Sequence, residues 1–334
     1  MSDGVQMSSL GVAVDAVFSY DPRVKVPQVP FGERRNLFLA KLCGSKKRPY
    51  GRYLGSPLRY AGGKSLAVGA VAERLPDSIK RLVSPFLGGG SVEVACAREM
   101  GLPVVAYDVF DILCNYWRVQ LQCPEALYQR LLAFPPSRKT FASVKERLRR
   151  HWMEGKRLDR FDLAAHYYFN SNTSYGPHFL GWPSDIYLAK KRYNNMIEKA
   201  RVFRAPGMDV RCASFENTIA LHQDDFLYCD PPYYLDDGKT FVGMYPHRNF
   251  PIHHEGFDHA LLRDLLAIHR GGFVLSYNDC DTIRDWYQGY EMMTPSWQYS
   301  FGQGDTRIGE NRERDNNGEY VKHSHELLIW RMPD

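Results

Sequence analysis

The feature that most restricts the fold of this chain is an alternation of short apolar runs with segments of helical periodicity, which begins after Ser56. The predicted strands are 81–86, 104–107, 225–229, 272–276 and 326–330, and the predicted helices are 91–100, 112–121 and 256–269. Strands that alternate with helices in this way predict an α/β fold built on a parallel sheet.

The alternation is interrupted by a helical and basic segment at 122–205, which carries ten Lys or Arg residues but only three acidic residues between positions 130 and 160. We therefore expect an inserted second domain at 122–205, flanked by an α/β domain made of residues 57–121 and 206–334. Residues 1–56 contain several prolines and basic side chains, and we interpret them as an N-terminal extension. A solvated tail is favoured there over an arm that contacts phosphates.

The inserted segment also contains an aromatic and polar run at 166–176. Aromatic rings beside basic side chains suit nucleic acid, because bases stack and phosphates pair with cations. The candidates for this contact are Arg138, Lys139, Arg149, Arg150, Asn172 and Tyr175. An aromatic run more often packs in a core, and a net charge of +5 is compatible with a polyanionic partner without demonstrating one.

A glycine loop joins the first predicted strand to its helix, with the sequence Pro85-Phe86-Leu87-Gly88-Gly89-Gly90-Ser91. Glycines allow a tight turn and a close approach of the backbone to a ligand, and the helix start offers unpaired N–H groups. Asp108 ends the next strand about 20 residues later, where a carboxylate can accept hydrogen bonds from ribose hydroxyls. Together they indicate a site for a ligand that contains adenosine, although three glycines alone are equally compatible with a simple turn.

A second motif, Asp230-Pro231-Pro232-Tyr233, directly follows the predicted strand 225–229. The two prolines stiffen the loop and remove two donors, so that it presents acceptors, namely the Asp230 carboxylate and the Pro231 carbonyl. Two converging acceptors suit an amino group with two hydrogens, and the ring of Tyr233 can stack on a planar base.

A third motif, Leu58-Arg59-Tyr60-Ala61-Gly62-Gly63-Lys64, combines a glycine turn with a cation, but it lacks the spacing of a nucleoside triphosphate loop. No metal site is predicted, because His253, His254 and His259 have no cysteine or carboxylate at ligand spacing. The seven cysteines form no C-x-x-C pair, and no apolar stretch is long enough to span a bilayer. These features predict a protein of a reducing cytoplasm.

In this order, the three motifs resemble those of the DNA adenine methylases, the family of the bacterial GATC methylase and its phage relatives. Tyr60-Ala61-Gly62-Gly63-Lys64 is similar to the family's N-terminal motif, and Pro85 to Ser91 is similar to its glycine-rich motif. Asp230 to Tyr233 is similar to its catalytic motif, and the resemblance covers about residues 57 to 330. It implies a Rossmann-like methyltransferase sheet with an inserted, mainly helical target recognition domain.

The resemblance implies transfer of a methyl group from S-adenosyl-L-methionine to N6 of adenine in double-stranded DNA, with S-adenosyl-L-homocysteine as the second product. The target base would be flipped onto Tyr233, and neither a metal nor a covalent intermediate is needed. The resemblance places the cofactor among Tyr60, Ala61, Gly62, Gly63, Lys64, Pro85, Phe86, Gly88, Gly89, Gly90, Ser91, Asp108 and Asp230.

Several alternatives stay open at the level of sequence. The methylated group could instead be another planar amino group, namely N4 of cytosine, the amino group of adenine in RNA or a side-chain amide. A catalytically silent DNA-binding relative would keep the same fold. A monomer is favoured, in a bacterial, archaeal or phage setting. A solitary methylase and one with a cognate restriction endonuclease are both compatible with the sequence.

Overall fold

The computed structural model describes residues 29–45, 48–234, 256–295, 313–314, 320–321 and 326–333. Residues 1–28 of the predicted extension lie outside this part. Its described remainder differs from the solvated tail that was predicted, because it forms helix α1 (Phe31–Lys41) and a hairpin of β1 (Cys43–Ser45) and β2 (Arg48–Tyr50). Phe31 and Phe38 of α1 are buried and belong to the same apolar core as helix α2 (Val68–Glu73).

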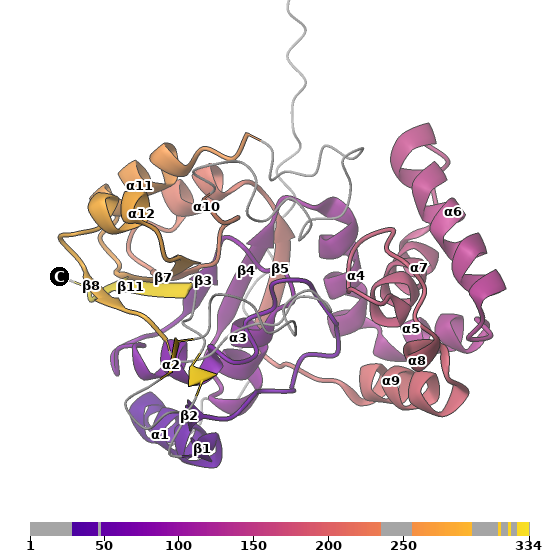
Figure 1. Ribbon diagram of the computed structural model, residues 1–334, viewed down its shortest axis with the longest axis horizontal. Coiled ribbons are helices and arrows are strands. Elements are labelled where there is room, and N and C mark those ends of the chain that lie inside the picture. Colours follow the sequence, from indigo (N-terminus) through magenta and orange to yellow (C-terminus); the bar gives the residue numbers. More distant parts are fainter. Residues whose placement is uncertain are drawn as a thin grey trace, which may run out of the picture.

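The centre of the fold is a seven-stranded sheet with the order β5-β4-β3-β6-β7-β11-β8 (Figure 1). The strands are β3 (Leu82–Ser84), β4 (Val104–Asp108), β5 (Met208–Cys212), β6 (Phe226–Cys229), β7 (Phe273–Asn278), β8 (Glu291–Met293) and β11 (Glu326–Arg331). The first five along the sheet, from β5 to β7, are parallel, whereas β11 is antiparallel to both of its neighbours. The predicted α/β fold with a largely parallel sheet is thus confirmed.

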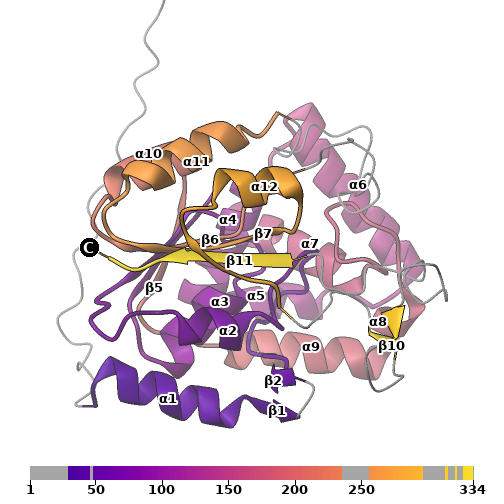
Figure 2. The same ribbon diagram turned by 60° about the vertical axis from the view of Figure 1, so that its left-hand side comes forward.

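Helices cover both faces of this sheet, because neighbouring residues of a strand point to opposite sides. Leu82 packs into the core on one face and Val83 into the core on the other. Figure 2 shows α2 and α3 (Ser91–Val94) on one side, with α10 (Phe215–Leu221), α11 (His259–Ile268) and α12 (Asp281–Trp286) on the other. Burial on both faces explains why the central strands read as continuous apolar runs in the sequence.

Several elements differ from the prediction in their length or existence. The helix predicted at 91–100 is α3 followed by a π-helical turn, η1 (Ala95–Glu99), and the helix predicted at 112–121 is α4 (Asp111–Gln122). Strands β5 and β8 were not predicted. Both lie at the edges of the sheet. β5 alternates apolar with polar residues over 5 positions and β8 has only 3 residues, so each leaves a weak periodic signal.

The segment 122–205 is helical, as expected, and lies to one side of the sheet (Figure 1). It contains α5 (Pro124–Leu132), α6 (Arg138–Glu154), α7 (Arg160–Thr173), α8 (Asp185–Leu188) and α9 (Lys190–Val202). Helix α6 begins where Ser137 Oγ accepts from the Thr140 N–H, and it ends at Gly155, which adopts a left-handed φ of 65°. The core of these helices is continuous with that of one sheet face, so the division at 122 and 205 stays a prediction.

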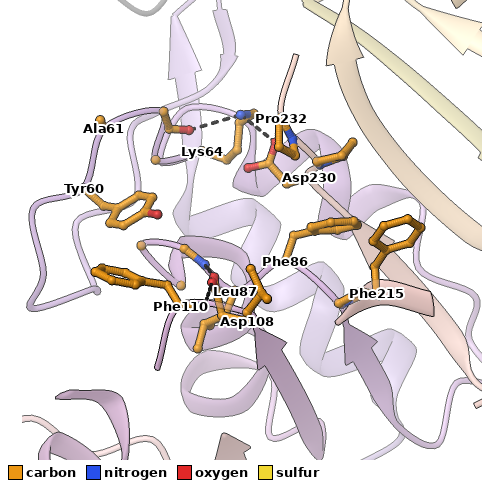
Figure 3. Close-up of a pocket in the computed structure, with 18 of the residues that line it drawn as sticks. Tyr60, Ala61, Lys64, Phe86, Leu87, Asp108, Phe110, Phe215, Asp230 and Pro232 are labelled. Carbon is orange, nitrogen blue, oxygen red and sulfur yellow. Dashed lines mark hydrogen bonds and ion pairs between the residues drawn. The ribbon is translucent and has the colours of Figure 1, made fainter. Parts of the chain in front are cut away.

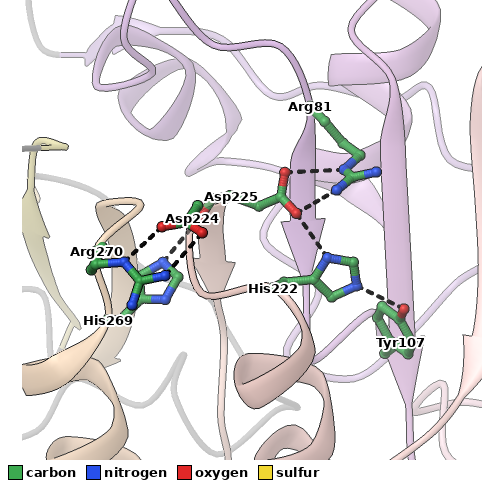
Figure 4. Close-up of polar contacts among 7 residues, drawn as sticks. All are labelled: Arg81, Tyr107, His222, Asp224, Asp225, His269 and Arg270. Carbon is green, nitrogen blue, oxygen red and sulfur yellow. Dashed lines mark hydrogen bonds and ion pairs between the residues drawn. The ribbon is translucent and has the colours of Figure 1, made fainter.

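A polar network ties the end of α10 to β4 and to the chain that leads into β3 and β6 (Figure 4). His222, just after α10, contacts the Tyr107 hydroxyl through Nε2 at 2.9 Å and the Asp225 carboxylate through Nδ1 at 2.8 Å. Arg81, which precedes β3, donates through Nε to the other oxygen of Asp225 at 3.1 Å. His222 and Tyr107 are buried, and buried polar groups are costly unless paired, so their contact helps to specify how α10 packs on the sheet.

Candidate active site

A cavity of about 430 Å³ opens at the carboxyl ends of the central strands, beside the point where the strand order reverses between β3 and β6 (Figure 3). Such a reversal is where open α/β sheets bind their ligands. All three predicted motifs line this cavity with residues from distant parts of the chain. The predicted residues that line it are Tyr60, Ala61, Gly62, Gly63, Lys64, Pro85, Phe86, Gly88, Gly89, Gly90, Ser91, Asp108, Asp230, Pro231, Pro232 and Tyr233.

The glycine loop lies against the ring of Tyr60. Gly88 and Gly90 have φ values of 47° and 64°, a region that side chains rarely adopt. A Cβ atom on Gly89 would stand 2.7 Å from Cβ of Tyr60. The carbonyl of Gly88 accepts a hydrogen bond from Nε1 of Trp117 in α4 at 3.0 Å, which fixes the position of the loop. The glycines are therefore needed for the shape of this wall.

Asp108, the last residue of β4, fastens the glycine loop to the next turn. Its two carboxylate oxygens accept from the backbone N–H groups of Gly88 and Phe110, each at 3.0 Å. The carboxylate is thus held in one orientation at the cavity wall. A hydroxyl-bearing ligand would find a preoriented acceptor here.

Lys64 and Asp230 form an ion pair in the cavity, with 2.7 Å between Lys64 Nζ and Asp230 Oδ1. The Lys64 side chain is 5% exposed and that of Asp230 is 20% exposed. Lys64 Nζ also donates to the carbonyl of Gly62 at 3.1 Å. Burial, with a smaller contribution from the charge of Glu326, raises the pKa of Asp230 to about 6 against the opposing effect of Lys64. Asp230 is therefore ionised at neutral pH but protonated in mild acid.

Two buried carboxyl groups in the cavity wall were not predicted from the sequence. Glu93 of α3 accepts a hydrogen bond from Ser84 Oγ at 2.6 Å, and burial raises the pKa of Glu93 to about 8. Glu326 of β11 accepts from the hydroxyl of Tyr233 at 2.6 Å. A lone acid inside an apolar helix or at the start of an apolar strand was the available signal for both.

The helical segment also reaches the cavity, through Pro177, His178 and Phe179 of the loop between α7 and α8. Their neighbour Leu180 has a φ of 56°, and its N–H donates to Asn170 Oδ1 at 2.8 Å. Left-handed backbone is costly for a branched side chain, so this loop is held in place by its surroundings. No local pattern in the sequence indicated that these residues would face the cavity.

The residues predicted to contact nucleic acid are arginines paired with acids, two exposed residues and one buried residue, Asn172. Arg138 pairs with Asp185 at 2.7 Å, and Arg149 and Arg150 each lie 2.8 Å from Glu146. Lys139 and Tyr175 are exposed. The pairing leaves the arginines on the surface with part of their charge already compensated.

Asn172 requires a correction, because it is 1% exposed and both ends of its amide are used inside the protein. Its Oδ1 accepts from the Arg59 N–H at 2.7 Å, and its Nδ2 donates to the Pro57 carbonyl at 3.2 Å. The guanidinium of Arg59 in turn donates to the carbonyls of Asn172 and Ser174, both at 2.9 Å. Asn172 thus anchors the end of α7 to the loop segment that precedes Tyr60.

The aromatic run of α7 packs in the core. Tyr167, Tyr168 and Phe169 are at most 2% exposed, so these three rings pack in the core, the reading that the sequence favoured, and Tyr167 also lines the cavity. Among the described residues, no group of three or more His, Cys, Asp or Glu side chains is arranged to hold a metal ion. His253 and His254 lie outside the described residues. No helix in the described part of the chain is long and apolar enough to cross a membrane.

Comparison with protein families matches residues 60–301 to the D12 class N6 adenine-specific DNA methyltransferases. The chain belongs to this family. The match includes Tyr60 to Lys64, the glycine loop and Asp230 to Tyr233, and it confirms the predicted family and the predicted adenine-specific methylation of DNA. The protein is an adenine-specific DNA methyltransferase.

Individual relatives are distant in sequence. The Type II methyltransferase M.FokI of Planomicrobium okeanokoites is 24% identical over 279 residues, which are 78% of this chain but only 42% of that protein. The Retron Ec67 DNA adenine methylase of Escherichia coli is 27% identical over 258 residues, 70% of this chain and 80% of that protein. The DNA adenine methylase of Vibrio cholerae is 28% identical over 251 residues, 70% and 85% of the two chains.

Proposed function

We propose that this D12 class methyltransferase binds S-adenosyl-L-methionine in the described cavity and that Asp230 and Pro231 hold the amino group of a flipped adenine there. The observation that carries the proposal is the Lys64–Asp230 ion pair, which joins the first and last of the three motifs at one wall of the cavity. Its site residues are those predicted from the sequence, apart from Asn172.

The side chains of the cavity fit this cofactor. Asp108 offers a fixed acceptor for ribose hydroxyls, and the glycine loop beside Tyr60 leaves backbone groups close to a ligand. Phe86 and Phe215 stack with their ring centres 5.7 Å apart and add an apolar wall for a planar ring (Figure 3). When bound, S-adenosyl-L-methionine supplies an electrophilic methyl group on a sulfonium centre.

The residues of the catalytic loop prepare the adenine nitrogen for attack. The lone pair of the N6 amino group is delocalised into the ring, which makes it a poor nucleophile. Hydrogen bonds from its two hydrogens to the Asp230 carboxylate and the Pro231 carbonyl would favour a pyramidal nitrogen and stabilise the developing positive charge. The nitrogen would bond to the methyl carbon as the bond from carbon to sulfur breaks with its electrons left on sulfur, and the proton that the nitrogen loses would pass to solvent, directly or through the Asp230 carboxylate.

The adenine must leave the duplex to reach this loop, at a cost of a few kcal/mol that stacking on Tyr233 helps to offset. We propose that the helices of 122–205 form the target recognition domain. Lys139 and Tyr175 are exposed there, and Trp182 is 72% exposed with Lys145 Nζ 4.8 Å from its ring centre. Exposed rings beside cations suit contact with bases and phosphates.

The proposals about partners depend on the relatives of this chain and not on the cavity. A further relative, the Modification methylase StsI of Streptococcus sanguinis, is 23% identical over 290 residues. Its name, like that of M.FokI, fits a restriction-modification setting. We propose double-stranded DNA as the substrate, a cytoplasmic location and a monomeric enzyme. A cognate endonuclease is a further proposed partner, and none is required for the chemistry.

The test is to express the protein in a host without adenine methylation and to map modified bases across the genome. We expect mass spectrometry of nucleosides to detect N6-methyladenine and the genome-wide map to place it in one sequence context. Both signals should be lost in Asp230→Ala. Asp224→Ala is the matched control, because Asp224 is an exposed carboxylate paired with Arg270 on the surface. N4-methylcytosine, methylated RNA, or full activity of Asp230→Ala would each contradict the proposal.

A further inference from the structure

The end of the catalytic loop that lies away from Asp230 is held by side chains from two neighbouring strands. Tyr233 donates its hydroxyl to Oε1 of Glu326 at 2.6 Å, and Glu326 is the first residue of β11. Glu326 is 6% exposed, so this hydrogen bond is largely shielded from water. A hydrogen bond to a buried charged group is stronger than one between neutral groups at the surface.

Asn278, the last residue of β7, holds the next residue of the loop. Its Oδ1 accepts from the Tyr234 N–H, and its Nδ2 donates to the Tyr234 carbonyl, both at 2.8 Å. Asn278 is 6% exposed, and it is the register partner of Glu326 in the antiparallel pairing of β7 with β11. Two paired positions at one end of the sheet therefore hold two consecutive residues of the loop.

We propose that Asn278 and Glu326 are positioning residues for methyl transfer, which together fix the loop from Asp230 to Tyr234 in its working geometry. This inference rests on the proposed function of that loop in holding the target adenine. Neither residue touches the reacting atoms in this scheme. Their role is to act through Tyr233 and Tyr234.

Proline makes this arrangement effective. Pro231 and Pro232 restrict the backbone between Asp230 and Tyr233, so the loop moves largely as one body. Lys64 pairs with Asp230 at one end, and Asn278 and Glu326 hold the other. A rigid loop fixed at both ends keeps its acceptors and its aromatic ring in register. This matters because a displacement of about 1 Å costs about a hundredfold in rate.

Aromatic packing supports the same end of the loop. The ring of Tyr234 makes edge contacts with Trp286 of α12 and with His259 of α11, at centre distances of 5.4 and 5.2 Å. These contacts keep the ring of Tyr234 packed if Asn278 is altered, whereas the Tyr234 backbone loses both of its hydrogen bonds to Asn278. We therefore expect substitutions at Asn278 to loosen the loop without unfolding the domain.

The charge of Glu326 affects the pH profile of activity, which a role in packing alone would not change. Glu326 raises the pKa of Asp230 through like-charge repulsion. Glu326→Gln keeps an acceptor for the Tyr233 hydroxyl but removes the charge. In this variant the acid limb of the kcat/KM profile should move to lower pH, while the catalytic loop stays in place.

The hydrogen bond itself is tested by a double-mutant cycle with Tyr233→Phe and Glu326→Ala. We expect each single variant to lower kcat about tenfold and the double variant to be no slower than the slower single one, because both remove the same contact. Asn278→Ala should lower kcat similarly, with little change in the Kd of S-adenosyl-L-homocysteine. The matched control is Glu291→Gln, an exposed carboxylate on neighbouring strand β8, which should behave as wild type.

Independent, additive losses in the cycle would overturn the inference. It would also fail if Glu326→Gln left the acid limb unmoved, or if losses disappeared once activity was expressed per folded molecule, as measured by thermal unfolding. A wild-type protein that methylates no adenine would instead refute the proposed function. The two failures are thus distinguishable in one set of assays.

Discussion

Replacing Lys64 by methionine should shift the pH dependence of methyl transfer upward. The substitution keeps an unbranched apolar stem but removes the ammonium that lies 2.7 Å from Asp230. Lys64 is one of the groups that lower the pKa of Asp230, against burial and Glu326, which raise it to about 6 in total. Without Lys64, only the raising effects remain.

The size of this shift follows from the distance. Two unit charges 2.7 Å apart attract by about 6 kcal/mol at an effective dielectric constant of about 20, which is an upper bound. Measured effects of a close opposite charge are about 1 to 3 pKa units. We therefore expect the pKa of Asp230 to rise from about 6 to about 7 to 9 in Lys64→Met. With a pKa near 8, only about a quarter of the molecules carry an ionised Asp230 at pH 7.5.

The assay is kcat/KM for transfer of a labelled methyl group to DNA between pH 5 and about 9.5. Wild type should lose activity as the pH falls through about 6, because a protonated Asp230 offers one acceptor fewer to the amino group. Lys64→Met should lose it at higher pH and recover as the pH rises, whereas Lys64→Arg should keep an acid limb near that of wild type. An unmoved limb in Lys64→Met, or a loss equal at every pH, would refute the reasoning.

Three further predictions concern the fold and the two ligands. Burial raises the pKa of Glu93 from 4.5 to about 8, so the folded state keeps a proton that the unfolded state loses in this window, and stability falls as the pH rises through it. Glu93→Gln should flatten this dependence of the free energy of unfolding on pH and stabilise the protein by about 3 kcal/mol at pH 7. Denaturant unfolding at pH 5 and 8 measures the dependence, and an equal dependence in the variant and wild type would contradict the prediction. Gly89→Ala should weaken binding of S-adenosyl-L-homocysteine at least about tenfold by calorimetry, because its Cβ would meet Tyr60, while Gly289→Ala, with nothing within 4 Å, should not. Lys139→Gln should lower the slope of log K for DNA against log salt by about 0.9, and an unchanged slope would remove Lys139 from the interface.

Much of the chemistry of this site could be read from short stretches of sequence. Asp230-Pro231-Pro232-Tyr233 follows a strand, and the glycine loop precedes a helix, as the local patterns indicated. Turn chemistry and periodicity act within windows of about ten residues, so they survive without knowledge of the rest of the chain. The residue types that the reaction needs were therefore visible before the fold was known.

Contacts between distant segments were not visible in this way. Asn172 looked like a surface residue of a basic segment, yet its amide holds the backbone of Arg59 and Pro57. Pro177 to Phe179 reach the cavity only because α7 packs against the sheet core. In each case a polar or apolar side chain has no distinguishing neighbours in sequence, and its partner is fixed by packing.

The sequence by itself predicted the residues of three motifs that line the cavity, because rigid turns and strand ends are encoded locally. Only the tertiary structure decided how the catalytic loop is held. Glu326 and Asn278 lie on strands that are separated in the chain, and they meet Tyr233 and Tyr234 because β7 and β11 pair in one particular register. Register depends on the burial of whole strands on both faces of the sheet, which no single segment of the sequence specifies.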